Sequence, residues 1–136
     1  MSNILAGVGI AQLEVLEERI KTKREIFAYY ARAFQGVRGI DFMPEITGSV
    51  GNRWLTTLTF KDYETRECVR LNLESDNIES RPLWKPMHLQ PLFEDHDAVT
   101  NGVSEQLFNN GLCLPSGTAM SQNDLDRVIK IIKASL

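Results

Sequence analysis

The fold is constrained first by the stretch Arg81-Pro82-Leu83-Trp84-Lys85-Pro86-Met87-His88-Leu89-Gln90-Pro91. Its three prolines remove three backbone donors and fix three φ angles, so neither a helix nor a central strand can run through it. Most of its other residues are apolar, yet the backbone cannot be regular. The sequence therefore predicts a shaped loop, and the rest of the chain has to be arranged around it.

This loop holds side chains that suit binding on a backbone with little conformational freedom. Lys85 supplies a cation, His88 a titratable imidazole and Trp84 an indole. The apolar neighbours of Lys85 also make it a candidate for desolvation and Schiff-base chemistry, the alternative being an ordinary lysine that meets a carboxylate or a phosphate. For the loop as a whole, the alternative is a connector that crosses the core, with Trp84 and Met87 filling space.

Size and composition predict one compact domain over residues 1–136. The chain is 43% hydrophobic and carries a formal net charge of −3, which gives no electrostatic footprint for nucleic acid or for an anionic membrane. It has no apolar window of about 18 residues and no secretion signal, so we expect a soluble cytoplasmic protein without a membrane span. Cys68 and Cys113 lack Cys-x-x-Cys spacing and are expected to be reduced thiols.

Metal binding and serine nucleophile chemistry are not expected. His88 and His96 are the only histidines, and with scattered acids they assemble neither a zinc nor a di-iron set. Ser116 lies in Leu114-Pro115-Ser116-Gly117, which lacks the flanking glycine of a nucleophile elbow. We expect Ser116 and Gly117 to form a turn into the last helix.

The N-terminal region predicts one long helix, capped by Ser2 or Asn3, running to about Gln35 and stopped by Gly36. Its later part has a single apolar side formed by Leu13, Leu16, Ile20, Phe27, Tyr30, Ala31 and Phe34. Its first turns are apolar on nearly every side, at Ile4, Leu5, Ala6, Val8, Ile10 and Ala11. We expect another chain or an upstream domain to cover them; the alternative is that they pack into this domain's own core.

The other elements follow from β-branched runs, caps and helical spacing. Strands are predicted at 40–43, 53–60, 77–81 and 112–115, with 53–60 central and 112–115 at an edge because of Pro115. Helices are predicted at 62–73, 99–110 and from a capping box at Ser121 onward. Their expected buried side chains are Cys68, Val69, Leu71, Val103, Leu107, Phe108, Leu125, Val128, Ile129 and Ile132. The fold class is α+β, with helices on a small, mainly antiparallel or mixed sheet.

Taken together, several segments resemble one known family. They are Met1-Ser2-Asn3-Ile4-Leu5-Ala6 with Gly9-Ile10-Ala11-Gln12-Leu13-Glu14, Asn52-Arg53-Trp54-Leu55-Thr56, Glu79-Ser80-Arg81 followed by the proline loop, and Gly111-Leu112-Cys113-Leu114-Pro115-Ser116-Gly117. In this order they resemble the C-terminal part of the DegT-type nucleotide-sugar aminotransferases. The resemblance implies the C-terminal small domain of the aspartate-aminotransferase fold. The form of the loop is most similar to members that make UDP-linked 4-amino-4,6-dideoxy sugars for glycan assembly.

The resemblance also implies what this chain lacks. Family members use pyridoxal phosphate, but their aldimine lysine, the acid that pairs with the pyridine nitrogen and most phosphate-binding groups lie in a large domain upstream of these residues. We therefore expect a fragment without catalytic or cofactor-binding residues of its own, inactive alone and needing the missing large domain. The family's homodimeric active site would account for the apolar helix start.

By resemblance, the loop contacts the nucleotide-sugar substrate. Lys85 and His88 are the first candidates, as partners of phosphate and hydroxyl oxygens. Trp84, Pro86 and Met87 are expected to line the site, with Arg81 nearby. The competing hypotheses are a non-catalytic module that dimerises or binds a ligand, and a stand-alone Schiff-base enzyme built on Lys85.

Overall fold

The computed structural model describes residues 2–136 and follows the predicted order of helices and strands, except that two helices replace the first one. Helix α1 (Asn3–Glu14) begins at Ser2, whose hydroxyl accepts a hydrogen bond from the Leu5 N–H at 3.3 Å. The predicted single helix is interrupted at Val15, and α2 (Leu16–Ala33) follows it. Neither glycine nor proline stands at this junction, and no side chain caps the start of α2, so the sequence does not mark it.

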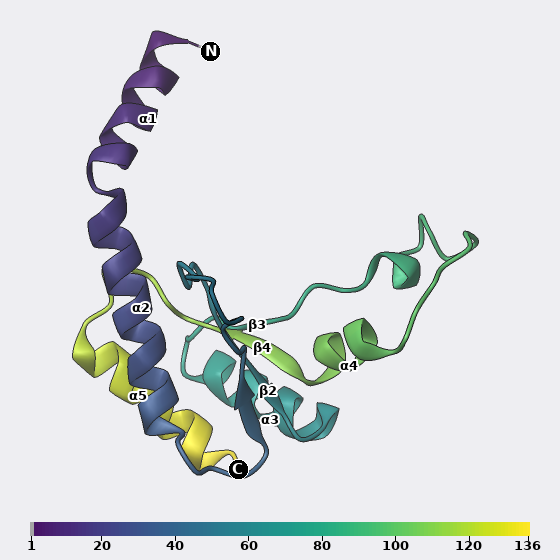
Figure 1. Cartoon of the computed structure of the whole chain (residues 1–136). Helices are drawn as coiled ribbons and strands as arrows, with labels where there is room; N and C mark the ends of the chain where they lie inside the picture. The colour runs from purple at the N-terminus through teal and green to yellow at the C-terminus, as the bar shows by residue number, and fades with distance from the viewer. Residues whose placement is uncertain (1) are drawn as a thin grey trace.

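Helix α1 extends away from the body of the molecule as a continuation of α2 (Figure 1). None of its residues is buried, and Ile4 is 80% exposed. The alternative that the helix start packs into this domain's own core is therefore wrong. The sheet and the C-terminal helix lie beside the second half of α2, so α1, at the other end of α2, does not contact them (Figure 1).

The buried side of α2 differs from the predicted one. Ile26, Tyr30 and Phe34 face the core at spacings of four residues, as one helical face should. The prediction missed Ile26 and included Leu13 and Leu16, which are exposed. The helix meets the sheet only along its second half, so the core face is set there and not by the apolar residues nearer the N-terminus.

Four antiparallel strands form the sheet, in the order β1-β2-β4-β3. They are β1 (Ile40–Phe42), β2 (Thr56–Phe60), β3 (Arg81–Pro82) and β4 (Gly111–Leu114). The central position of β2 is confirmed. The prediction that 112–115 forms an edge is wrong, because β4 lies between β2 and β3. Pro115 lies just after the strand. Pro82 is the proline within the sheet, and the edge strand β3 tolerates it because proline has no N–H to donate to a neighbouring strand.

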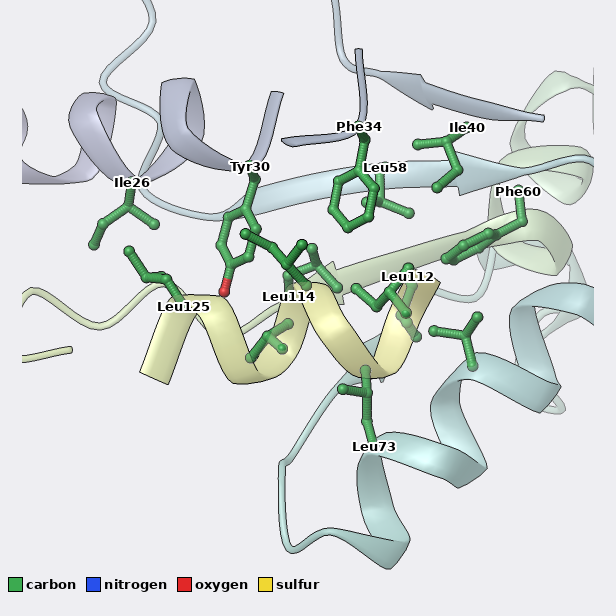
Figure 2. Packing of buried hydrophobic residues seen from close by; sticks show 14 residues of the cluster. Ile26, Tyr30, Phe34, Ile40, Leu58, Phe60, Leu73, Leu112, Leu114 and Leu125 are labelled. Carbon is green, nitrogen blue, oxygen red and sulfur yellow. The ribbon is translucent and has the colours of Figure 1, made fainter. Parts of the chain in front are cut away.

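Helices α3 (Tyr63–Ser75) and α5 (Gln122–Ala134) complete the core with α2 and the sheet. The Asp62 carboxylate accepts from the Thr65 N–H at 2.8 Å, and Ser121 with Asp124 forms the predicted capping box. The predicted stripe of α5 is buried as expected. Figure 2 shows α2, α3, α5 and the strands contributing side chains to one layer. Its buried apolar residues are Ile26, Tyr30, Phe34, Ile40, Leu58, Phe60, Val69, Leu73, Leu112, Leu114, Leu125, Val128, Ile129 and Ile132.

Some predicted core residues are not in that layer. On α3 Cys68 and Leu71 are exposed, and the core contacts come from Val69 and Leu73. Helix α4 (Val103–Asn110) begins four residues later than predicted, and its Val103 and Leu107 are also exposed. A short helix beside the sheet edge has less apolar surface to face than one packed across the sheet.

The proline-rich stretch belongs to a long excursion of the chain, residues 83–102, which we call the arm. It leaves β3, makes the 3-10 turn η1 (Met87–Leu89) and returns to α4, extending away from the sheet (Figure 1). The predicted shaped loop is thus confirmed, but it does not cross the core. No helix within residues 2–136 is long and apolar enough to span a membrane.

Candidate functional site

A cavity of about 460 Å³ opens where the ends of β3 and β4 approach α2. Its lining brings together three of the segments singled out from the sequence: Trp54 precedes β2, Arg81 and Trp84 come from the start of the proline-rich stretch, and Ser116 follows β4. The antiparallel pairing of β2, β4 and β3 places these segments at one side of the sheet. The complete lining is Lys23, Trp54, Leu55, Glu79, Ser80, Arg81, Pro82, Trp84, Cys113, Leu114, Pro115, Ser116 and Gly117.

Two tryptophans face each other at this cavity. The ring centroids of Trp54 and Trp84 are 6.0 Å apart with an interplanar angle of 31°. The two residues are 62% and 65% exposed. An indole that filled core space would be covered, so the interpretation of Trp84 as a core-crossing residue is wrong. The two indole rings instead expose a flat, apolar aromatic surface to solvent.

Several polar groups of the cavity already form hydrogen bonds or ion pairs within the protein. The Lys23 ammonium donates to the Ser116 carbonyl oxygen at 2.5 Å, and burial lowers the pKa of Lys23. The Ser116 hydroxyl, itself buried, accepts from the Thr56 N–H at 3.4 Å. Ser116 thus ties α2 to β2 at the turn predicted for it. At the mouth Arg81 pairs with Glu79 at 2.5 Å, in an exposed position.

The Cys113 thiol also lines the cavity. Burial raises the pKa of this thiol, with a smaller opposing influence from Arg81. A raised thiol pKa means less thiolate, so the group acts as a weakly polar wall and not as a nucleophile.

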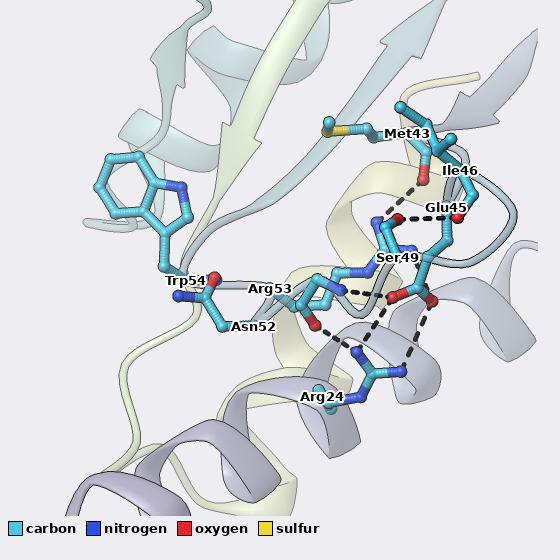
Figure 3. A network of polar contacts seen from close by, with 9 residues as sticks. Arg24, Met43, Glu45, Ile46, Ser49, Asn52, Arg53 and Trp54 are labelled. Carbon is cyan, nitrogen blue, oxygen red and sulfur yellow. Dashed lines mark hydrogen bonds and ion pairs between the residues drawn. The ribbon is translucent and has the colours of Figure 1, made fainter.

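The segment that carries Trp54 is held by a polar network (Figure 3). The Glu45 carboxylate accepts from the Gly51 N–H at 2.6 Å and from Arg24 at 3.1 Å, and these hydrogen bonds lower the pKa of Glu45. Arg53 adopts a left-handed φ of 51° and donates to the Met43 carbonyl at 3.0 Å. A left-handed residue without glycine needs surrounding contacts to hold it. The network supplies them and fixes the backbone before Trp54.

The arm presents most of the predicted loop residues to solvent. Lys85 and Met87 are exposed. Of the two interpretations of Lys85, the desolvated lysine is therefore wrong, because the surrounding apolar residues do not cover it, and the ordinary solvated lysine stands. The turn itself is ordered. The Gln90 side-chain amide donates to the Lys85 carbonyl at 3.2 Å, and the Gln90 N–H donates to the Met87 carbonyl at 3.0 Å. The Nε2 atom of His88 lies 2.5 Å from Oε1 of Glu105 on α4.

The predicted site residues therefore fall into two places. Arg81 and Trp84 are at the cavity, whereas Met87 and His88 line a smaller hollow of about 260 Å³ within the arm. Lys85 and Pro86 lie in the segment between them. The sequence interpretation missed the contributions of Lys23 and Glu105. Lys23 lies in a helix rich in charged residues, and Glu105 is the single charged residue of α4, so no spacing distinguishes either of them. The sequence places Trp54 in a predicted strand and in a segment of the family resemblance, without a role at the site.

Pyridoxal phosphate, implied by the resemblance, needs a lysine for its aldimine and a partner for its pyridine nitrogen. The cavity holds one lysine, Lys23, whose ammonium is bound to a backbone carbonyl, and one carboxylate, Glu79, which is paired with Arg81. These side chains do not fit a complete site for the cofactor. The described part of the chain also contains no group of three or more His, Cys, Asp or Glu side chains that could hold a metal ion.

Comparison with known proteins gives a consistent result. The Bacillus subtilis (strain 168) protein EpsN, named as a pyridoxal phosphate-dependent aminotransferase, is 49% identical over 137 residues, covering 97% of this chain and 35% of EpsN. A GDP-perosamine synthase of Vibrio cholerae is 29% identical, covering 98% of this chain and 37% of the synthase. The chain thus spans about a third of the length of these relatives.

The fold also has solved counterparts. A solved structure of Spr1654 from Streptococcus pneumoniae, named as a sugar aminotransferase, superposes with a TM-score of 0.89 at 24% identity, and the match covers 99% of this chain and 35% of that one. The expected aminotransferase-type fold is thus confirmed. The family model of the DegT/DnrJ/EryC1/StrS aminotransferases matches residues 1–133, and the chain belongs to that family.

Proposed function

We propose that this chain is the small, substrate-facing domain of a cytoplasmic pyridoxal-phosphate aminotransferase that aminates a keto nucleotide sugar. Family membership over residues 1–133 supports the reaction class, and the name of the Vibrio cholerae relative supports a nucleotide-sugar substrate. Within that class, a UDP-linked 4-keto-6-deoxy sugar used in surface glycan assembly is the substrate we propose. The cofactor and the large domain that holds it come from residues outside 1–136.

The observation that carries this proposal is the exposure of chemically capable side chains on an ordered arm. The arm exposes a tryptophan, a lysine and a methionine to solvent on a hydrogen-bonded turn. A segment that only connected β3 to α4 would not require these exposed side chains. We assign the Lys85 ammonium to substrate phosphate and His88 to a substrate hydroxyl. Trp84, Pro86 and Met87 line the site, and Arg81 contributes at the cavity.

The first test is a titration of the purified chain with pyridoxal phosphate, followed by the absorbance of a protein aldimine. We expect no saturable aldimine, since Lys85 is solvated and Lys23 is bound to a carbonyl, so the isolated chain should not transaminate. Lys85→Ala is the control. A saturable aldimine that disappears in Lys85→Ala would overturn the proposal and make the arm a catalytic centre in its own right.

The second test restores the missing part. A chimera in which this chain replaces the matching third of EpsN should aminate a UDP-4-keto-6-deoxy sugar in the presence of pyridoxal phosphate, detected by mass spectrometry. His88→Ala within the chimera should weaken the reaction. A folded, cofactor-loaded chimera that leaves the keto sugar unchanged, beside an active EpsN, would count against the proposed substrate.

A non-catalytic dimerisation or ligand-binding module is the second candidate. It is favoured by the exposed apolar side chains of α1, which need a partner in any assembly. Stable binding of a nucleotide sugar by this chain, together with an inactive but folded chimera, would favour this alternative. In the proposed aminotransferase, the same helix joins the chain to the large domain and contributes to a homodimer.

A further inference from the structure

One side-chain pair joins the two ends of the arm. His88 lies on the outgoing limb and Glu105 on α4, after the arm has returned, and their Nε2 and Oε1 atoms are 2.5 Å apart. Both side chains are sheltered but not buried, with 20% and 35% of their surface exposed. Within residues 2–136 the His88 ring makes no other hydrogen bond. Two further titratable side chains, His96 and Asp97, line the same hollow.

The backbone at the start of α4 places Glu105 for this contact. Gly102 has a left-handed φ of 79°, which lets the returning chain turn directly into the helix. The Asn101 side-chain oxygen then accepts from the Val103 N–H at 3.2 Å, and the Gln106 N–H donates to the Gly102 carbonyl at 3.0 Å. Glu105 thus occupies the first helical turn, where the helix dipole favours a negative charge.

The chemistry of the pair limits what the ring can do. An ionised carboxylate accepts hydrogen bonds but cannot donate them, so Nε2 must carry the hydrogen that it shares with Glu105. In the neutral imidazole the other nitrogen, Nδ1, is then an acceptor. A ring held in this form can receive a hydroxyl hydrogen, but it cannot donate to the oxygen of a phosphate.

We propose that Glu105 is a positioning residue, which holds His88 through Nε2 so that Nδ1 is the acceptor presented to the ligand. The ligand group at His88 is then a sugar hydroxyl, whereas phosphate oxygens are left to the ammonium of Lys85. The identity of the ligand rests on the proposed function; the pairing of His88 with Glu105 does not. The family resemblance by itself leaves phosphate and hydroxyl oxygens shared between Lys85 and His88.

The positioning role is tested without any ligand, by ¹⁵N NMR of the histidine rings in the full chain under conditions where the rings are neutral. For His88 we expect a protonated Nε2, an unprotonated Nδ1 and an Nε2–H that exchanges slowly with water. His96, whose ring makes no hydrogen bond to any of residues 2–136, serves as the internal reference and should exchange fast. An unprotected Nε2–H at His88 in the unaltered chain would overturn the proposal without any variant.

Variants separate positioning from simple structural support. Glu105→Ala removes the acceptor and should abolish the slow exchange, whereas Glu105→Gln keeps an oxygen at the same distance along the side chain and should retain it. Gln106→Ala shortens an exposed side chain on the same helix and is the matched control, with no expected change at His88. Equal His88 spectra in Glu105→Ala and in the unaltered chain would contradict the proposal.

A titration with two probes then tests the ligand assignment. UDP supplies the nucleotide and phosphates, and UDP-glucose adds sugar hydroxyls. Both His88→Ala and Glu105→Ala should weaken UDP-glucose binding about fivefold and leave UDP affinity unchanged, as expected for one lost neutral hydrogen bond. Equal losses for both probes would contradict the hydroxyl assignment. Failure of the unaltered chain to bind either probe, with a protected Nε2–H, would count against the proposed function and not against the positioning by Glu105.

Discussion

At the scale of single residues, Glu45 collects donors from distant parts of the chain. The Gly51 N–H is its strongest partner, followed by Arg24 on α2, while Arg53 pairs with it at 3.5 Å. All three interactions are stronger with the ionised carboxylate than with the protonated one. The backbone before Trp54, and hence one wall of the cavity, depends on the charge of one side chain.

The low pKa of Glu45 predicts how stability should change with pH. A carboxyl whose pKa is lower in the folded than in the unfolded protein contributes stability above its ordinary pKa of 4.5, and that contribution is lost as the pH falls through the folded value. Glu45→Gln should therefore reduce the free energy of unfolding at pH 7 and flatten its decline on the acid side of pH 4.5. Urea denaturation across this range checks the prediction.

Glu25→Gln is the matched control for this experiment. Glu25 also lies near a cation, but its pair with Lys21 is 4.0 Å long and exposed, and such pairs contribute little to stability. A pH profile that shifts equally in Glu25→Gln and Glu45→Gln would show that the network does not act through Glu45.

Two neighbouring tyrosines on α2 provide a second prediction. Tyr30 is fully buried, its hydroxyl donates to the Pro115 carbonyl at 3.0 Å, and burial raises the pKa of the phenol, so the donor is retained through the neutral range. Tyr30→Phe leaves that carbonyl without its donor and should cost about 1 to 2 kcal/mol of unfolding free energy. Tyr29→Phe removes an exposed bond to Asp126 and should cost less. Denaturant titration of both variants compares them.

At the scale of elements, β4 is packed on both sides and tolerates no added volume at its first residue. A Cβ on Gly111 would lie 2.2 Å from Cδ1 of Leu83 and 2.4 Å from the Leu107 carbonyl oxygen. Since one of these atoms is backbone, the clash cannot be relieved by a side-chain rotation alone. The close approach of α4, the arm and the sheet depends on the absence of a side chain there.

Gly111→Ala is therefore expected to destabilise the fold by about 1 to 3 kcal/mol, the usual cost of overpacking. Gly117→Ala is the control, because its added Cβ would meet only Cγ of Met120 at 3.9 Å and its φ is not left-handed. Thermal unfolding followed by circular dichroism should show a lower midpoint for the first variant and little change for the second. Similar midpoints for both would mean that β4 and α4 can separate without cost.

Local sequence signals predict where helices and strands lie better than they predict which other elements those helices and strands contact. The capping box at Ser121 and the β-branched run of β2 each act within a few residues, and both predictions are confirmed. The interior position of β4 depends on its pairing with β3. Because β3 is only two residues long and contains a proline, no local sequence pattern predicts this pairing. The same reason hid Glu105: its partner lies seventeen positions away in sequence.

At the scale of the whole molecule, the chain is a core of sheet and helices with two extensions, α1 and the arm (Figure 1). The extensions carry much of the exposed apolar surface, including Ile4, Leu5, Val8, Ile10, Leu13, Trp84 and Met87. Surface of this kind marks contact with a partner. In the proposed enzyme both extensions meet the rest of the protein or a second copy.

Alone, the chain is expected to fold and to self-associate through Ile4, Leu5 and Val8. Replacing Leu5 and Val8 by lysine should make it monomeric, because charges cannot be buried in an apolar contact without a partner. At a concentration where both chains are monomeric, the unfolding midpoint should stay the same, since α1 contributes no residue to the core. Light scattering over a concentration series measures the association, and a strictly monomeric unaltered chain at high concentration would contradict the prediction.

The junction at Val15 has a consequence for amide hydrogen exchange. An isolated helix of about twelve residues is marginal in water, and α1 has twelve residues without a buried side chain. Its amides should therefore exchange orders of magnitude faster than those of α2 beyond the junction, although the two helices run end to end. Protection of the α1 amides against exchange therefore reports assembly. It should appear when a partner covers the helix, and it can be measured for each residue without a labelled ligand.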